Sequence, residues 1–161
     1  MREQYWKLYL NLKYNYYYCV HFLFYYNRLN WIVSSFLTIV SLSSVAALGV
    51  WKNHPLPWSA LICSSQIIQA LFPRLPYNDL LCSTRLMIGS LDKLVMDMSH
   101  SWLSFDLRKH SDDEIFLLYK EYEERYVDLT DTFYSGVFLP NNKYCHKKSY
   151  EEINAFFSDD F

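Results

Sequence analysis

The chain has 161 residues, of which 52% are hydrophobic and 20% are charged, and this length is typical of one domain. With 15 Tyr, 11 Phe and 5 Trp against 3 Gly and 5 Pro, the composition excludes a disordered, collagen-like or low-complexity chain. The formal net charge of −2 provides no global basic field of the kind that nucleic-acid-binding proteins carry. The cysteines are widely spaced and form no CxxC pair, so neither a disulfide framework nor a structural zinc site is expected: Cys19, Cys63, Cys82 and Cys145.

Residues 1–28 are rich in aromatic side chains and contain neither Gly nor Pro. This pattern predicts an N-terminal cytoplasmic or interfacial helix that continues directly into the next segment. Its aromatic side chains, from Tyr5 and Trp6 to Tyr26, are expected to lie against lipid headgroups or a partner helix.

A run without charged residues follows between Arg28 and Lys52. Residues 29–51 would form a helix of about 34 Å, long enough for a ~30 Å hydrocarbon core, with Trp31 and Trp51 near its two ends. The run starts too late and is too long for a signal peptide, so we expect it to remain as an anchor.

A second uncharged run extends from Pro55 to Pro73, and within it residues 57–73 are the predicted second transmembrane helix. The connecting loop carries the single Lys52, whereas several Lys and Arg precede the first run and follow the second. This distribution predicts that both termini are cytoplasmic. The alternative is a buried hairpin within a soluble helical bundle.

The C-terminal region, 78–161, carries helical signals throughout and no strand-like alternation. After Pro73 and Pro76, Asn78 or Asp79 can cap a helix. That helix carries apolar residues at spacings of three and four, the seam of a coiled coil or bundle: Ile88, Leu91, Val95, Met98, Trp102 and Phe105.

Two capping boxes are expected to start further helices in this region, at Ser111–Glu114 and at Ser149–Glu152, with a turn over 139–142 between them. The helix after the first box has a predicted buried face of Ile115, Leu118, Tyr122, Tyr126, Leu129 and Phe133. The predicted fold class is therefore an all-α membrane protein: a two-transmembrane helical hairpin with long cytoplasmic helices, assembling as an oligomeric bundle.

Each uncharged run carries a stripe of polar side chains at helical spacing. The first stripe contains Asn30, Ser34, Thr38, Ser41 and Ser44, and the second contains Ser59, Cys63, Gln66 and Gln69. Polar groups in hydrocarbon need partners or water, so the stripes either pack helices together or line a pore formed by several hairpins. Because neither run contains Asp, Glu, Lys or Arg, a pore would have weak ion selectivity from its own side chains.

Signals for an enzyme or a metal site are weak, and neither a catalytic residue nor a metal ligand nor a cofactor is predicted. The chain has no GxSxG, HExxH, Walker or GxGxxG motif. The groups Cys145-His146 and Met96, Met98, His100 match no known metal-site spacing.

Two basic clusters are candidates for a nucleotide-binding site. One contains Arg108 and Lys109 followed by His110, and the other contains Lys147 and Lys148 preceded by His146. Aromatic residues lie near both, so a phosphate site with base stacking is one interpretation. Solvated or membrane-surface charge is the other.

The chain resembles the SLATT family of small bacterial two-transmembrane effectors over about residues 5–105. The resemblance lies in the aromatic lead-in helix, the tight turn around His54-Pro55, the exit segment 66–74 and the long helix from Asn78 to Trp102. It implies a homo-oligomeric, pore-forming effector of anti-phage defence in the bacterial inner membrane. A tetramer is one assembly that such an effector would form. A cyclic or linear oligonucleotide made by a neighbouring nucleotidyltransferase would gate the channel, and depolarisation would cause growth arrest or cell death.

Two other functional classes remain open at the level of sequence. The first is a non-conducting membrane adaptor whose cytoplasmic helices dock a partner enzyme, with the polar stripes serving packing alone. The second is a soluble all-helical interaction protein. The sequence leaves open whether a nucleotide opens or closes the pore.

Overall fold

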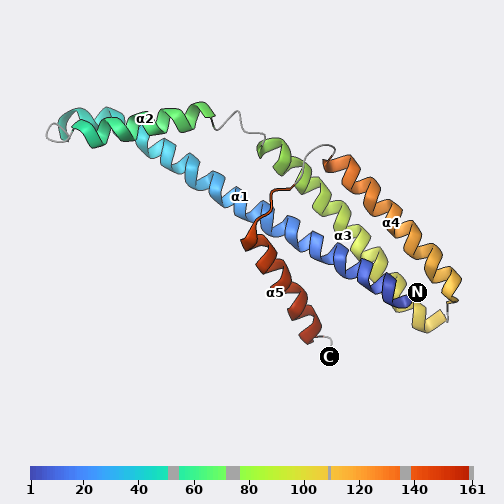
Figure 1. Ribbon diagram of the computed structural model, residues 1–161. Helices are drawn as coiled ribbons and strands as arrows, with labels where there is room; N and C mark the ends of the chain where they lie inside the picture. The colour runs from blue at the N-terminus through green and yellow to red at the C-terminus, as the bar shows by residue number, and fades with distance from the viewer. Residues whose placement is uncertain (51–54, 72–76, 109, 135–138, 160–161) are drawn as a thin grey trace. The chain divides into compact units, whose positions relative to one another are not determined.

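The computed structural model describes residues 1–50, 55–71, 77–108, 110–134 and 139–159, all of them helical or in short connections. Within these ranges nothing is described for the side chains of 42–50, 55, 57, 58, 61, 77, 78, 106–108 and 157–159. Five helices follow one another over the described residues, and the predicted all-α class is confirmed: α1 (Arg2–Val50), α2 (Pro55–Leu71), α3 (Tyr77–Arg108), α4 (Asp112–Tyr134) and α5 (Lys143–Asp159) (Figure 1).

The helices belong to two units. The bundle unit contains residues 1–24 and 80–161, and the hairpin unit contains residues 25–79. The prediction that the N-terminal helix runs without a break into the first uncharged run is confirmed, because α1 extends from Arg2 to Val50. No Gly or Pro interrupts it before Gly49.

The bundle unit is built around the first half of α1. Tyr5, Tyr9 and Leu12 of α1 are buried in one cluster with residues of α3 and α4. Further along α1, Cys19 packs with Met87 and Leu91 of α3. Tyr5 donates a 3.0 Å hydrogen bond to the carbonyl of Met98, whereas the later Cys19 packs with the earlier Met87, so α1 and α3 run antiparallel. The aromatic side chains of residues 1–28 therefore include several that pack on partner helices of the same chain.

The predicted seam of α3 is buried as expected. Leu91 and Met98 are fully buried, Phe105 is 1% exposed, and the other three seam residues pack against the two clusters. The partner of this seam is α1 of the same chain. The seam is therefore packed mainly within one copy.

α4 begins and packs as the sequence predicts. At its start the Glu114 amide donates to the Ser111 hydroxyl (3.3 Å) and the Ser111 amide donates to the Glu114 carboxylate (3.0 Å), which is a capping box. On its inner face Ile115 and Tyr122 are buried, and the other predicted residues are partly buried around the same clusters. α4 lies antiparallel beside α3 (Figure 1), joined by the 3.1 Å ion pair of Arg125 with Asp97.

The predicted start of the last helix is wrong. α5 begins at Lys143, and Asn142 caps it by accepting hydrogen bonds from the amides of Tyr144 (2.9 Å) and Cys145 (3.4 Å). Ser149, the predicted cap, lies in the middle of α5, fully buried, where its hydroxyl donates to the Cys145 carbonyl. The Ser-x-x-Glu pattern is met by chance there, because packing of α5 on α1 decides which residues face inward.

The hairpin unit contains the second half of α1 and α2, with α2 alongside the C-terminal part of α1 (Figure 1). α2 has 17 residues, a length of about 26 Å. Among the described residues, no helix combines the length and the apolar character needed to cross a membrane. The predicted span 29–51 extends beyond the described residues, as do residues 72 and 73 of the predicted span 57–73.

Candidate functional site

The polar stripe of α1 lies mostly on open surface of the hairpin unit. Ser34, Thr38 and Ser41 are exposed, Asn30 is half-buried, and the side chain of Ser44 is outside the described part of the chain. Thr38 donates a 2.9 Å hydrogen bond to the Ser34 carbonyl, so its donor is satisfied within the helix. The Thr38 hydroxyl can therefore face either water or another helix, because its hydrogen is already bonded.

The polar stripe of α2 is exposed along its whole length: Ser59, Cys63, Gln66 and Gln69. Among the described side chains of the hairpin unit, those that are buried are Val40 of α1 and Ser65 of α2. Ser65 donates to the Ile62 carbonyl at 2.8 Å. The stripes therefore do not form the contact between the two helices of one hairpin, and packing within a single copy does not account for them.

Large apolar side chains share the surface of the hairpin unit with the stripes. Trp31 is 71% exposed, Ile39 63%, Leu56 82% and Ile67 59%. Among the described residues of this unit, Val40 is the sole member of the buried hydrophobic core. Exposure of large apolar groups to water is unfavourable, so this surface is a candidate for contact with lipid or protein.

The first basic cluster is only partly described. Lys109 and the side chain of Arg108 lie outside the described residues, so their predicted role stays a prediction. His110 lies 3.1 Å from the Glu114 carboxylate and 3.3 Å from the Ser104 hydroxyl. The hydrogen bond from the Ser111 amide is the main cause that lowers the pKa of Glu114, and the contact with His110 is the next. His110 therefore supports the start of α4.

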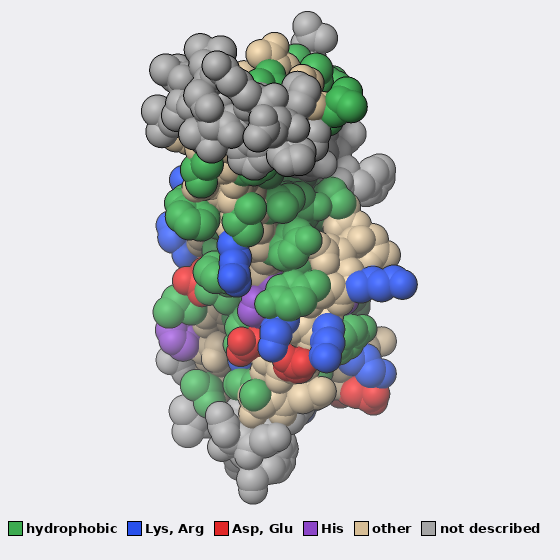
Figure 2. Space-filling model, turned by 90° about the vertical axis from the view of Figure 1, so that its left-hand side faces the viewer, with side chains coloured by type: hydrophobic (Ala, Val, Ile, Leu, Met, Phe, Trp, Pro, Cys, Tyr) green, Lys and Arg blue, Asp and Glu red, His purple; other side chains and the backbone are tan. Residues whose placement is uncertain are grey.

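The second basic cluster is divided between two sides of α5. His146 faces α1, where it hydrogen-bonds to Tyr14 and packs 4.7 Å from the Tyr18 ring. Lys147 and Lys148 face outward, 3.9 and 2.6 Å from the carboxylate oxygens of Glu151. The close contact raises the pKa of Lys148 and lowers that of Glu151. Figure 2 shows a face on which Lys and Arg alternate with Asp and Glu rather than forming a continuous basic patch.

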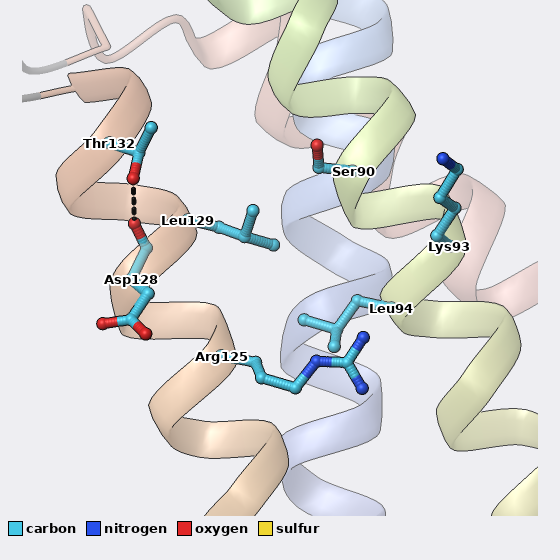
Figure 3. A pocket seen from close by; sticks show the side chains of 7 residues that line it. All are labelled: Ser90, Lys93, Leu94, Arg125, Asp128, Leu129 and Thr132. Atoms are coloured by element: carbon cyan, nitrogen blue, oxygen red, sulfur yellow. Dashed lines mark hydrogen bonds between the residues drawn. The ribbon is translucent and has the colours of Figure 1, made fainter.

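A shallow groove of about 330 Å³ lies between α3 and α4, and local sequence reasoning did not find it. Its lining contains two leucines, two cationic side chains, two hydroxyls and a carboxylate: Ser90, Lys93, Leu94, Arg125, Asp128, Leu129 and Thr132. Figure 3 shows Arg125 reaching from α4 toward α3, while the Asp128 carboxylate points away from α3. Arg125 is paired with Asp97, so Lys93 is the cation here without a partner among the described residues.

The candidate metal-binding groups are not brought together. Met96 is exposed, whereas Met98 is fully buried on the inner face of α3. Cys145 is also buried, and burial raises the pKa of its thiol. Among the described residues, no three His, Cys, Asp or Glu side chains are placed to hold a metal ion.

Comparisons with known proteins identify no relative. Neither a family model, nor a curated protein, nor a solved structure matches this chain.

Proposed function

We propose that this chain is a pore-forming membrane protein in which several copies of the hairpin unit assemble around a water-filled path. The observation that carries the proposal is the surface of α1 and α2, where polar stripes and large apolar side chains are both exposed in a single copy. The apolar side chains would face lipid. The stripes would face one another across the path, where water satisfies Gln66 and Gln69.

The dimensions are compatible with a thin or locally thinned bilayer. A helix of 17 residues is at the short end of the range that crosses a hydrocarbon core, and a bilayer adjusts its thickness to a short helix at modest cost. α1 has ample length, because its uncharged part starts at Leu29 and the helix continues to Val50.

The resemblance to SLATT effectors supports the biological setting of the proposal. In that setting, the pore opens in a bacterial inner membrane as part of anti-phage defence, both termini are cytoplasmic, and a nucleotide signal acts on the bundle unit. A ligand can gate the pore only if it binds the open and closed states with different affinities. Lys147 and Lys148 are the described candidates for its phosphate groups, and charge reversal at both tests this role by nucleotide binding.

Membrane potential in cells that express the chain tests the proposal. We expect a potential-sensitive dye to report depolarisation by the wild-type chain and loss of that effect in the Gln66→Leu variant. Ile67→Leu is the matched control, because Ile67 is also exposed on α2 but lies outside the stripe. A wild-type chain that inserts and assembles without depolarising the cell, both alone and with the neighbouring nucleotidyltransferase co-expressed, would favour the adaptor, and extraction into buffer without detergent would refute both.

A further inference from the structure

α3 has a second face with coiled-coil spacing, on the side away from its buried seam. Its residues follow one another at spacings of four and three, and all are exposed: Cys82, Leu86, Gly89, Lys93, Met96, His100 and Leu103. Leu86, Met96 and Leu103 are 58%, 56% and 63% exposed. A Cβ placed on Gly89 would meet no atom within 4 Å, so the surface is open there. We call this the outer face of α3.

α4 has a matching outer face. Its residues have the same spacing and are also exposed: Asp113, Leu117, Lys120, Glu124, Val127 and Asp131. Leu117 is 65% exposed and Val127 is 50% exposed. Each of the two outer faces thus carries apolar side chains seven to ten residues apart, interspersed with charged ones.

The two faces carry complementary charges. The outer face of α3 presents the ammonium of Lys93, which has no partner among the described residues. The outer face of α4 presents the carboxylates of Glu124 and Asp131, and Lys120 lies 3.6 Å from Glu124 within the same helix. A parallel pairing of α3 with α3 would place Lys93 of one copy against Lys93 of the other. A pairing of α4 with α4 would bring like carboxylates together. Pairing the α3 face with the α4 face avoids both repulsions.

We propose that the outer face of α3 in one copy binds the outer face of α4 in the next copy, so that the bundle units form a closed ring. The proposal rests on the proposed function, because hairpins in one membrane place all copies at the same height. Within one chain α3 and α4 are antiparallel, with Asp97 at the level of Arg125 and Thr84 near Tyr134. In a ring whose symmetry axis is parallel to α3 and α4, rotation from one copy to the next does not change the height of any residue. Helices of neighbouring copies therefore keep this register.

That register matches the side chains of the two faces. It places Leu103 at the level of Leu117 of the next copy, Met96 at the level of Glu124, and Lys93 at the level of Val127, between Glu124 and Asp131. Leu103 therefore meets Leu117, and the long Lys93 side chain lies about one helical turn from the Glu124 and Asp131 carboxylates. Because the two surfaces differ, the contact is heterologous, and such contacts close into rings when the rotation between copies permits.

Disulfide cross-linking of the full chain in membranes tests the ring, in a background with Cys63→Ser and Cys82→Ser. The double variant Leu103→Cys, Leu117→Cys should give a ladder of multimers on oxidation, and each single variant should remain monomeric. Lys93→Glu should lower the association constant roughly three- to tenfold, since it replaces an exposed attraction by a repulsion. Combining it with Glu124→Lys should restore the association.

The outcomes separate this inference from the proposed function. Dimers formed by Leu103→Cys alone, or depolarisation without any ladder from the double variant, would overturn the ring contact and leave the pore proposal standing. A ladder from an assembly that never conducts would support the contact and refute the pore. A chain with neither a ladder nor depolarisation, even with the neighbouring nucleotidyltransferase co-expressed, would refute both.

Discussion

The start of α5 can be tested by two substitutions with opposite expected results. Asn142→Ala removes the side-chain oxygen that accepts hydrogen bonds from the amides of Tyr144 and Cys145. Loss of such a cap costs about 1 kcal/mol, within a range of about 0.5–2 kcal/mol. For a chain of this size, about 1 kcal/mol lowers Tm by roughly 2–4 °C. The Tyr18 hydroxyl keeps its contact, because it accepts from the backbone amide of Asn142.

Ser149→Ala is the informative comparison, because the sequence pattern predicts Ser149 as a helix cap. If the Ser149 hydroxyl capped a helix, its loss would cost the same ~1 kcal/mol. In the structure this hydroxyl donates to the Cys145 carbonyl inside α5, and Ala is the better helix former, so we expect a change within about 0.5 kcal/mol.

Thermal unfolding followed by circular dichroism, in detergent, gives both values. Asn142→Asp is the control that retains a cap and should unfold close to the wild-type temperature. A Ser149→Ala variant as unstable as Asn142→Ala, or more so, would refute the assignment of the α5 start.

Three further predictions concern the core of the bundle unit and the exposure of the cysteines. Leu91→Ala should lower the free energy of unfolding by about 3–5 kcal/mol, because Leu91 is fully buried. Leu103 is 63% exposed in a single copy, so Leu103→Ala should change the stability of the dispersed, monomeric chain by less than about 0.5 kcal/mol. Chemical denaturation measures both, and equal effects would contradict the core described here. A thiol reagent should modify exposed Cys63 and Cys82 in the native chain and reach Cys19 and Cys145 only on unfolding, which mass spectrometry can follow; rapid native labelling of Cys19 would contradict its burial. Burial raises the pKa of Cys19 to about 11, so the folded state holds this proton more tightly than the unfolded state does. The resulting contribution to the free energy of unfolding should be complete below about pH 9 and should be lost as the pH rises toward 11. Denaturant titrations at several pH values measure this loss, and it should be absent in Cys19→Ala.

Local signals predicted the features that local interactions decide. The Ser111–Glu114 capping box and the inner face of α4 are encoded within a few turns of helix, and the structure has both. The seam of α3 was predicted from its spacing, but spacing cannot tell whether the partner belongs to the same chain. Here α1 fills it, through contacts such as that between Tyr5 and Met98.

Features that depend on distant residues could not be read from the sequence. The groove needs Lys93 and Arg125 on neighbouring helices, and no local spacing links them. The false second capping box has the same origin, because Ser149 is buried by packing against another helix rather than placed by its neighbours in sequence. The outer face of α3 is recognisable only once its opposite face is known to be filled.

The central claim is that the stripe of α2 faces water within a membrane while its apolar side faces lipid. Labelling of Gln66→Cys and Ile67→Cys by a membrane-impermeant thiol reagent tests it directly, with the full chain reconstituted in lipid bilayers and Cys63 and Cys82 replaced by Ser. Both positions are exposed in a single copy, so the assembly and the bilayer decide the result. The account predicts labelling of Gln66→Cys and protection of Ile67→Cys, and equal labelling or equal protection of the two variants would contradict it.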